Sequence, residues 1–531
     1  MNFFDHWALG AAVFIPSIGA AIIMLWPRRD EATIKGIALL TSLLAFGVGI
    51  YITVHFNYNH TGVLQFQVNR SWIEVIGARY HVGVDGISLP LMMLSLFITV
   101  ACIVYSWDHF PEPHNPKAFL ALMLILETGM VGTFVAEDLI LFFVFFELVL
   151  LPMFFMIGVW GGPNRQYASI KFFLFTLFGS ALMILSFLAL YFQAGHTFDI
   201  PTLIHTARSL PHSTQVLIFA GLFMGFAIKV PMFPFHTWLP DAHTEAPTVG
   251  SVILAAILLK LGTYGFIRIA IPILPSAARS WAPWIGLLAV IGIIYGALAC
   301  LAQTDLKRLI AFSSVAHMGF VMLGIATLNS YGINAAVFGM VAHGLITGML
   351  FFCAGSIQER FHTREIARMG GLLKQAPYLG WILGFCAFAS LGLPGLAGFW
   401  GEFPAILAAF QPATGLSLAA FRTYMVVAAI GTVFAAGYLL WMYQRTAFGN
   451  PKSEWDDAHI HDVHVPEWIA WAPMLLLIVV LGLAPSIIFR VTDAPVHRVT
   501  LQVDMVSPNP AVAAAAASAS AAASAASPGQ P

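Results

Sequence analysis

Four charged side chains in this sequence lie deep inside long apolar stretches: Glu127, Glu147, Lys229 and Lys260. A charge in the middle of a hydrocarbon layer is costly unless it is paired or hydrated, so each is a candidate functional residue. Burial lowers the pKa of a lysine and raises that of a carboxylic acid, which brings both toward neutral pH. A carboxylate that moves toward or away from such a lysine changes its affinity for a proton. These residue types therefore indicate loading, holding and release of protons across an apolar barrier.

Each of these residues also has a purely structural interpretation. A buried lysine can form a fixed ion pair or extend its head to the membrane surface, and a buried glutamate can pin a neighbouring helix. Glu127 is the weakest candidate, because Thr128 and Gly129 could let water or a neighbouring group satisfy it locally. The structural interpretation becomes weaker when several such residues lie on separate helices.

Two histidines inside apolar stretches add groups that titrate near neutral pH. His317 lies in LIAFSSVAHMGF and His343 lies in FGMVAHGLITG. Each imidazole could relay a proton through water, and each could equally be a hydrogen-bonded core histidine. A haem held by both rings is a further alternative, but nothing else in the sequence supports it.

The sequence contains few residues in a pattern that could bind a metal or a cofactor. The four cysteines stand alone in separate apolar stretches, so no cluster of thiolates could hold zinc or an iron–sulfur cluster. No GxGxxG motif follows a predicted strand. Four residues of a polar loop have spacing that resembles a metal site: His459, His461, Asp462 and His464. We predict no metal and no cofactor in this chain.

The apolar stretches predict an all-α polytopic membrane protein. The 531 residues are 59% hydrophobic and 9% charged, whereas about a quarter of the residues of soluble proteins are charged. The apolar residues fall in continuous runs of about 20, the length that crosses a hydrocarbon core as a helix. We predict about 14 transmembrane helices, which begin near Trp7, Ile34, Gly86, Ala118, Leu139, Ala168, Val216, Val249, Pro283, Leu309, Ala335, Pro377, Leu416 and Trp468.

Two segments interrupt their own helices with proline and glycine: KVPMFPFHTWLPDAH at 229–243 and LGLPGLAGFWGEF at 391–403. Inside a membrane, interrupted backbone is tolerated only where protein or water covers the freed polar groups. Two broken helices about five spans apart are typical of inverted repeats in transporters. Lys229 precedes the first break and Glu402 follows the second, so a titratable residue lies beside each one.

The predicted spans divide the chain into five parts: 1–117 with helices 1–3, 118–272 with the first repeat (helices 4–8), 273–449 with the second, inverted repeat (helices 9–13), 450–490 with a loop and helix 14, and 491–531 as a polar and then Ala/Ser-rich tail. The tail has no apolar face, so we predict that it is disordered. Loops after odd-numbered helices carry most of the lysine and arginine. This bias places those loops in the cytoplasm of a bacterial-type inner (plasma) membrane, and both termini on the opposite side.

Long stretches of the sequence resemble one family of membrane proteins. Residues 229–264 (KVPMFPFHTWLPDAHTEAPTVGSVILAAILLKLGTY) and 305–320 (DLKRLIAFSSVAHMGF) are similar to the most characteristic segments of the antiporter-like subunits of respiratory complex I, and of the related Mrp-type antiporters. VGVDGISLPL near Asp85, FFELVLLPMF around Glu147 and WMYQRTAFG near Arg445 also match, so the resemblance covers nearly the whole chain.

The glutamate on the second broken helix separates the branches of this family. Subunits L and N typically have a lysine there, whereas subunit M has a glutamate, and this chain has Glu402. The sequence therefore resembles the subunit M branch, to which mitochondrial NADH dehydrogenase subunit 4 is similar. In that branch Glu147 and Lys229 would form an ion pair coupled to neighbouring subunits, and Lys260 would be the central proton carrier.

The same resemblance assigns the remaining candidates. His317 and His343 would continue a hydrated path to Glu402, the terminal site toward the far side. Lys307 lies in a matching motif near the cytoplasmic end of the tenth helix. The implied function is that of a proton-translocating membrane subunit of NADH-quinone oxidoreductase, a multisubunit translocase.

The implied partners are the other membrane subunits of the complex, including two further antiporter-like subunits of the L and N types. NADH, FMN, iron–sulfur clusters and quinone would be handled by other subunits. Two alternatives stay open. One is an Mrp-type cation/proton antiporter subunit without a redox partner, against which Glu402 counts. The other is a structural scaffold, which predicts that neutral replacement of Lys260 or Glu147 leaves pumping intact.

Overall fold

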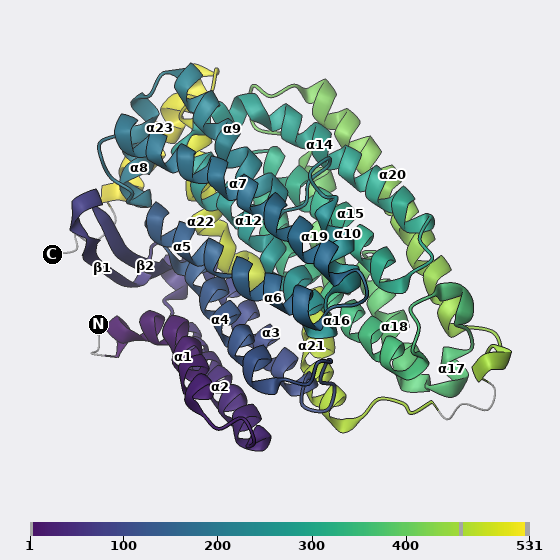
Figure 1. Ribbon diagram of the computed structural model, residues 1–531. Helices are drawn as coiled ribbons and strands as arrows, with labels where there is room; N and C mark the ends of the chain where they lie inside the picture. Colours follow the sequence, from purple (N-terminus) through teal and green to yellow (C-terminus); the bar gives the residue numbers. More distant parts are fainter. Residues whose placement is uncertain (1–3, 456–459, 526–531) are drawn as a thin grey trace.

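Long apolar helices make up most of the protein and lie side by side in one bundle (Figure 1). The computed structural model describes residues 4–455 and 460–525. Within these residues, 13 helices are long and apolar enough to cross a membrane. Apolar runs of this length satisfy their backbone groups in hydrocarbon only as helices, which is why they fold in this way. The predicted all-α polytopic membrane fold is therefore confirmed.

The elements follow the chain from purple to yellow in Figure 1. The first group comprises α1 (Asp5–Leu25), α2 (Glu31–His55), β1 (Gln65–Ile73), β2 (Ala78–Val84), α3 (Ser88–Tyr105), α4 (Pro116–Val135), α5 (Leu139–Leu148), α6 (Leu150–Trp160), α7 (Arg165–Gln193), α8 (Ile200–Thr206) and α9 (His212–Lys229). The second comprises α10 (Trp238–Glu245), α11 (Thr248–Ile253), α12 (Leu259–Gly265), α13 (Ile271–Ile273), α14 (Pro275–Leu301), α15 (Leu306–Ala326) and α16 (Ser330–Phe361). The third comprises α17 (Leu372–Gln375), α18 (Pro377–Ser390), α19 (Ala397–Ala408), α20 (Leu418–Ala447), α21 (Val465–Leu483), α22 (Ser486–Asp504) and α23 (Pro510–Ala525).

Several of these helices join into single spans. α5 and α6 together form the span Leu139–Trp160, and α11, α12 and α13 form the span Thr248–Ile273. The twelfth predicted span, by contrast, is divided into the two shorter helices α18 and α19. The total of about 14 spans and their arrangement as two inverted repeats stay predictions.

The first break follows Lys229, the last residue of α9. Pro231 and Pro234 have no N–H group with which to continue the helix, so the chain turns before α10 begins at Trp238. The indole Nε1 of Trp238 donates a hydrogen bond of 2.9 Å to the carbonyl oxygen of Ile228. This bond satisfies one of the polar groups that the break would otherwise leave without a partner.

The second break separates α18 from α19. Gly392 and Gly395 have φ angles of +80° and +94°, a left-handed conformation that glycine adopts without steric cost. Pro394 between them cannot donate to a helix. Ser390 therefore ends one helix, and Glu402 lies on the next.

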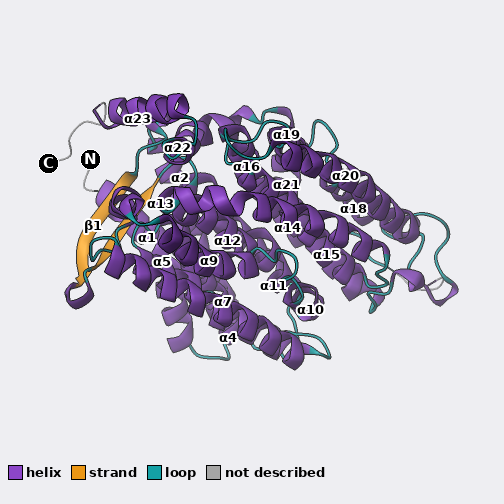
Figure 2. Ribbon diagram, turned by 90° about the horizontal axis from the view of Figure 1, so that it is seen from above, coloured by secondary structure: helices purple, strands orange, loops and turns teal. Residues whose placement is uncertain are grey.

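A β-hairpin, which the sequence analysis did not predict, covers one end of the bundle. Strands β1 and β2 pair antiparallel, and Gly77 at the turn has a φ angle of +68°. The carbonyl oxygen of His81 accepts a hydrogen bond of 2.8 Å from the backbone N–H of Glu137. The imidazole Nδ1 of His81 lies 2.6 Å from Oδ1 of Asp199. We call this end the hairpin end and the opposite end, where α16 finishes, the Arg360 end. Seen from above, the sheet lies at one edge of the bundle and α20 at the other (Figure 2).

The prediction that 491–531 is disordered is wrong for the part of the tail that the structure describes. α22 continues to Asp504 and α23 extends from Pro510 to Ala525. The physical reason is that α22 has an apolar side, with Val496 and Val503 fully buried. α22 packs against α16, α14 and α23.

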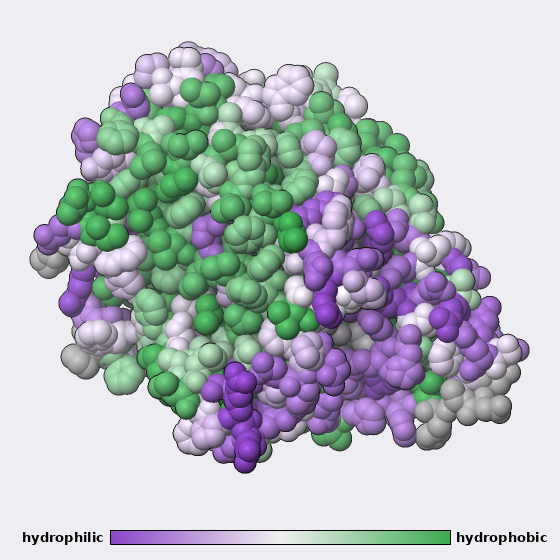
Figure 3. Space-filling model, viewed as in Figure 1, coloured by the Kyte–Doolittle hydropathy of each residue, from purple (hydrophilic) through white to green (hydrophobic). Residues whose placement is uncertain are grey.

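The lateral surface is strongly hydrophobic, as a membrane protein requires. On α7, Leu174, Phe178 and Leu185 are each more than half exposed. Figure 3 shows a broad hydrophobic area over the region of α5, α7 and α9, with hydrophilic residues gathered toward the lower right. Lipid or neighbouring subunits would cover such a surface.

Candidate functional site

Lys260 lies in the interior of the bundle, where the helix changes its form. It follows the π-helical segment Leu254–Leu258, and its side chain is fully buried. Its Nζ donates a hydrogen bond of 2.5 Å to the carbonyl oxygen of Ala255 and lies 2.7 Å from Nδ1 of His343 on α16. Short π segments are frequent at functional sites. The ammonium group therefore faces a possible proton acceptor at hydrogen-bond distance.

A second polar cluster surrounds His317 on α15. Its Nδ1 lies 2.5 Å from Oε1 of Glu402 on α19. Its Nε2 lies 3.1 Å from the hydroxyl of Ser390 at the end of α18, and 3.1 Å from that of Tyr438 on α20. The break between α18 and α19 brings Ser390 and Glu402 to the same ring. With a carboxyl group on one nitrogen and hydroxyls on the other, the imidazole can take up a proton on one side and release it on the other.

The rings of His343 and His317 join these two clusters. Their centroids are 6.0 Å apart. Both rings, together with Ser390 and Glu402, line a cavity of about 20 Å³, which is room for roughly one water molecule. Lys260, His343, His317 and Glu402 thus form one row of titratable side chains, which we call the Lys260 row. The structure brings these four predicted residues together.

Lys229 and Glu147, at the first broken helix, are not in direct contact. Lys229 Nζ lies 4.8 Å from the centroid of the Phe146 ring and has no hydrogen-bond partner among the described residues. Glu147 on α5 accepts a hydrogen bond from the hydroxyl of Ser180 on α7. The direct ion pair that the resemblance implied is therefore not formed here, because the Phe146 ring lies against the ammonium and Ser180 holds the carboxylate.

Close packing nevertheless places Lys229 on the helix next to Lys260. A Cβ atom added at Gly262 on α12 would lie 2.7 Å from the carbonyl oxygen of Phe226 on α9 and 3.1 Å from Cβ of Lys229. Real Cβ atoms rarely approach this closely, so the absence of a side chain at Gly262 permits the contact between α9 and α12.

Lys307 lines a wide cavity at the Arg360 end of the bundle. The cavity has a volume of about 460 Å³, and His109, Glu359 and Arg364 also line it. Lys307 Nζ donates a hydrogen bond of 3.3 Å to the carbonyl oxygen of Ala246. His109 Nδ1 forms an ion pair with Glu359. Burial acts to lower the pKa of His109, but the hydrogen bond and charge of Glu359 outweigh it and raise that pKa.

His243 on α10 is a titratable residue that the sequence analysis missed. Its ring is fully buried and stacks on Phe351 with a centroid distance of 4.5 Å and an interplanar angle of 9°. Neither ring nitrogen has a hydrogen-bond partner in the described part of the chain. His243 is close enough to both Lys307 and Lys260 to interact with their charges.

Glu127 is buried but lies apart from the Lys260 row. It is on α4, and its Oε1 accepts a hydrogen bond of 3.1 Å from the hydroxyl of Ser42 on α2. Its Oε2 has no partner within the residues that the structure describes. No hydrogen bond in that part of the chain joins Glu127 to Lys260 or Glu402.

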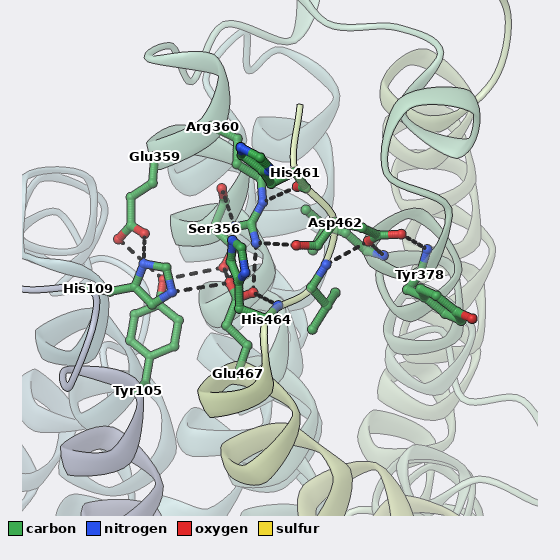
Figure 4. Close-up of polar contacts among 12 residues, drawn as sticks. Tyr105, His109, Ser356, Glu359, Arg360, Tyr378, His461, Asp462, His464 and Glu467 are labelled. Carbon is green, nitrogen blue, oxygen red and sulfur yellow. Dashed lines mark hydrogen bonds and ion pairs between the residues drawn. The ribbon is translucent and has the colours of Figure 1, made fainter. Parts of the chain in front are cut away.

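The polar loop with metal-like spacing has a structural use at the Arg360 end (Figure 4). Arg360 bonds to Glu467 at 2.7 and 3.0 Å, and to the carbonyl oxygens of His461 and Asp462 at 2.7 and 3.0 Å. The Asp462 carboxylate accepts hydrogen bonds of 2.8 and 3.0 Å from backbone N–H groups of the first turn of α18. His459 lies outside the described residues, and within them no group of three or more His, Cys, Asp or Glu side chains could hold a metal.

A further charged cluster, also missed from the sequence, lies at the hairpin end. Arg268 pairs with Asp85 at 2.6 Å and with Glu137 at 3.6 Å, and it donates a hydrogen bond of 3.1 Å to the hydroxyl of Tyr264. Asp85 and Glu137 line a cavity of about 230 Å³. Burial raises the pKa of Glu137 to about 7, although Arg268 acts against it.

Two family models match successive parts of the chain. The model described as NADH-ubiquinone oxidoreductase chain 4, amino terminus, matches residues 37–133. The model described as NADH:quinone oxidoreductase/Mrp antiporter, TM, matches residues 136–431, which include the whole Lys260 row.

Similar proteins cover nearly the full length. NADH-quinone oxidoreductase subunit M of Rickettsia conorii is 40% identical over 499 residues, which are 93% of this chain and 99% of that relative. NADH-ubiquinone oxidoreductase chain 4 of Chondrus crispus is 39% identical over 472 residues, 89% and 93% of the two chains. A chain of respiratory complex I from Thermus thermophilus with bound NADH has a TM-score of 0.83 at 28% identity, with 93% and 99% coverage.

A chain of the Mrp complex from Dietzia sp. DQ12-45-1b has a TM-score of 0.80 at 21% identity, and the match covers 93% of this chain and 52% of that one. This likeness is one of fold alone. The two family models together extend over most of the sequence, and the full-length relatives share about two residues in five. The chain therefore belongs to the family of NADH-quinone oxidoreductase subunit M and NADH-ubiquinone oxidoreductase chain 4.

Proposed function

We propose that this chain is a proton-translocating membrane subunit of NADH-quinone oxidoreductase, and that protons cross it along the Lys260 row. The observation that carries this proposal is a row of titratable side chains on four different helices, of which Lys260, His343 and His317 are buried and Glu402 is 12% exposed. Lys260 lies 2.7 Å from His343 at one end of the row, and His317 lies 2.5 Å from Glu402 at the other. Electron transfer from NADH to quinone would take place on other subunits.

Protons would reach the row from the Arg360 end. The Lys307 cavity of about 460 Å³ is wide enough for water, and the His109–Glu359 pair at its wall can exchange protons with that water. The charges of Lys307 and Lys260 both act on the buried His243 ring, and its nitrogens, unpartnered within the described residues, would provide the next station. The route therefore begins in polar surroundings and ends at a buried amine.

Transfer along the row needs one bridging water. The Lys260 ammonium gives a proton to Nδ1 of His343, which then releases a proton from Nε2 toward the cavity that it shares with His317. His317 takes up this proton on Nε2, beside the Ser390 hydroxyl, and gives the proton on Nδ1 to the Glu402 carboxylate. Each ring then carries its proton on the other nitrogen, and a flip of the ring, which exchanges the places of the two nitrogens, restores the starting arrangement.

Lys229 and Glu147 would control when Lys260 releases its proton. The ammonium of Lys229 repels a proton held on the neighbouring helix, and the Glu147 carboxylate weakens this repulsion when it is close. In the present arrangement Ser180 holds the carboxylate and Phe146 lies against the ammonium. A signal from a neighbouring subunit that closes or widens the Glu147–Lys229 distance would then change the affinity of Lys260 for protons.

The proposal extends to the surroundings of the chain. The Arg360 end, where the basic loops gather, would face the cytoplasm, and both termini would lie on the other side. Neighbouring antiporter-like subunits of the L and N types would cover the apolar flanks. FMN, iron–sulfur clusters and the quinone would be held by partner subunits, and no redox centre would belong to this chain.

The direct test is proton pumping by membrane vesicles that carry Lys260→Ala and are driven by NADH, with assembly of the complex checked in parallel. We expect an assembled complex whose pumping falls at least about tenfold, because the variant removes the amine that lies 2.7 Å from His343 Nδ1. Lys374→Ala is the matched control, since Lys374 is a lysine on α17 that bonds to Asn450 away from the row.

Normal pumping by assembled Lys260→Ala complexes would contradict the proposal and would favour a structural scaffold. The second candidate function is an Mrp-type cation/proton antiporter subunit, which the Mrp-like fold favours. Co-purification of the chain separates the two: flavin and iron–sulfur subunits support the oxidoreductase, and their absence from a cation-transporting complex supports the antiporter.

A further inference from the structure

A wide groove at the Arg360 end is unrelated to the proton path. It has a volume of about 810 Å³ and lies between the end of α1 and start of α2 on one side and α6 on the other, with α4 as its floor. A pocket of this size is within the range that binds a drug-sized or larger ligand. Its walls are polar at the end of the bundle and apolar toward the interior of the membrane.

The polar part of the groove carries a surplus of positive charge. Arg28, Lys117 and His114 line it, together with the single acid Glu31. Glu31 is already engaged, because its carboxylate lies 2.7 Å from Lys35 and 2.9 Å from His114. Lys117 uses one of its three donors on the carbonyl oxygen of Trp26 at 2.8 Å.

Arg28 is the basic residue of this set whose hydrogen-bond donors are all available to a ligand. It is exposed, and it forms no hydrogen bond or ion pair within the described residues. Its guanidinium and the remaining donors of Lys117 therefore point to an anion with several acceptor oxygens, such as a phosphate group.

The apolar part of the groove follows one face of α4 away from its N-terminus. Ala118, Leu122 and Ile125 are each separated by about one helical turn, so they form a stripe about 10 Å long. Phe155 on α6 and Met24 on α1 flank this stripe and are 46% and 55% exposed. An apolar channel that begins beside a cationic mouth and opens toward lipid matches a molecule with an anionic head and an acyl chain.

We propose that this groove binds one anionic phospholipid, with its phosphate at Arg28 and Lys117 and an acyl chain along α4 beside α6. Basic pockets between transmembrane helices on the cytoplasmic side of a membrane bind anionic lipid headgroups in this way. A free phosphate ion would use only the mouth and would leave the apolar stripe without an occupant. The lipid would hold α1 and α2, which lie at the edge of the bundle in Figure 1, against α4 and α6.

The test uses the purified whole complex in detergent and phosphatidylglycerol with a photoreactive diazirine on an acyl chain. After irradiation, labelled peptides of this subunit are quantified by mass spectrometry. We expect labels on α4 and α6, and a fall of about thirtyfold in Arg28→Gln/Lys117→Gln complexes, because each of the two basic groups contributes about 1 kcal/mol to anionic lipid binding. Arg29→Gln, which removes a neighbouring arginine that does not line the groove, should leave the labelling within about twofold.

A second variant tests the apolar half without any change of charge. Leu122→Trp fills the stripe and should also lower the labelling, even though the cationic mouth is intact. Excess unlabelled phosphatidylglycerol should compete, whereas phosphatidylcholine and inorganic phosphate should not. Equal competition by phosphatidylcholine would overturn the proposal in favour of general lipid contact, and competition by phosphate would overturn it in favour of an ion site. Unchanged labelling in the assembled double variant would overturn it as well.

Discussion

The Lys260 row and the first broken helix use the same residue types in opposite geometry. In the row, Lys260 lies within hydrogen-bond distance of a histidine, and Glu402 lies 2.5 Å from another. At the first broken helix, Lys229 lies against the ring of Phe146, and Glu147 bonds to a serine hydroxyl. Both regions place a lysine and a glutamate in a hydrophobic interior, but only one of them connects its titratable groups to each other.

This difference indicates that the two regions have different roles. A proton moves between groups that are in contact or bridged by one water, so the Lys260 row is suited to transfer. Charges that are not in contact act on each other only through the electric field, which falls with distance and is stronger in a low dielectric. The Glu147–Lys229 region is therefore suited to sensing and switching. Variants that preserve charge but change distance should separate these two roles.

The largest expected effect is at the far end of the row. Glu402→Gln removes the final proton acceptor, and we expect a loss of about a hundredfold in coupled pumping. Glu402→Asp keeps the charge but shortens the side chain by about 1.5 Å, which takes the carboxylate out of hydrogen-bond range of His317. Both variants should impair pumping, as measured by NADH-driven acidification of vesicles.

The matching change in the other region should be much milder. Glu147→Asp keeps its charge near Lys229, and a field effect tolerates a shift of this size far better than a contact does. Assembly of each variant complex is checked by its subunit composition. If Glu147→Asp proved as damaging as Glu402→Asp, the distinction between a contact relay and a field effect would fail.

A smaller effect is expected from the two hydroxyls that share Nε2 of His317. Ser390→Ala and Tyr438→Phe each remove one partner but leave the other, so each alone should slow pumping by no more than about threefold. The double variant leaves Nε2 without a hydroxyl partner and should lose more than the product of the two single losses. This excess is the coupling energy of a double-mutant cycle. Strictly multiplicative losses would show that the hydroxyls do not serve the same nitrogen.

Phe146→Leu should produce a still smaller change, of about twofold in coupled turnover, because it removes a cation–π contact with Lys229. Without the ring, the Lys229 ammonium loses this favourable contact, which would alter the switch. Phe145→Leu is the matched control, since it removes a buried ring one residue earlier on the same helix. The experiment compares pumping with NADH oxidation. Equal effects of the two variants would mean that packing, not the cation–π contact, is responsible.

Part of this architecture could be predicted from the sequence because its signals are local. Runs of apolar residues define spans without any tertiary information, and the proline-rich and glycine-rich windows around Pro231 and Pro394 interrupt the helical hydrogen bonds locally. Lys260 and Glu402 stand out because a charge in an apolar run is rare and costly. The positions of both broken helices and the candidates of the Lys260 row therefore followed from short windows of the chain.

Other features depend on packing between distant segments and left no local signal. His243 lies in a short polar stretch with Asp241 and Thr244, which resembles a loop until α10 is seen to fold into the interior. The Ser180 hydroxyl reaches Glu147 only because α7 packs beside α5 and α6. The β-hairpin and the cluster around Arg268 likewise require partners that are far away in the sequence.

The last prediction, with the smallest expected effect, concerns the Arg268 cluster. It asks whether this cluster of charged groups contributes to stability alone or also carries protons. Folding raises the pKa of Glu137 from 4.5 to about 7, so between these values the folded protein holds a proton that the unfolded chain has lost. Stability from this group is then present below about pH 4.5 and is lost as the pH rises toward 7.

Glu137→Gln cannot titrate, so its melting temperature relative to the unmodified complex should rise between pH 5 and pH 8. Glu74→Gln, at an exposed acid of the hairpin, should show no such trend. A parallel pH profile for Glu137→Gln and the unmodified complex would show that Glu137 does not titrate in this range. A loss of pumping as large as that of Glu402→Gln would instead make the cluster part of the proton path.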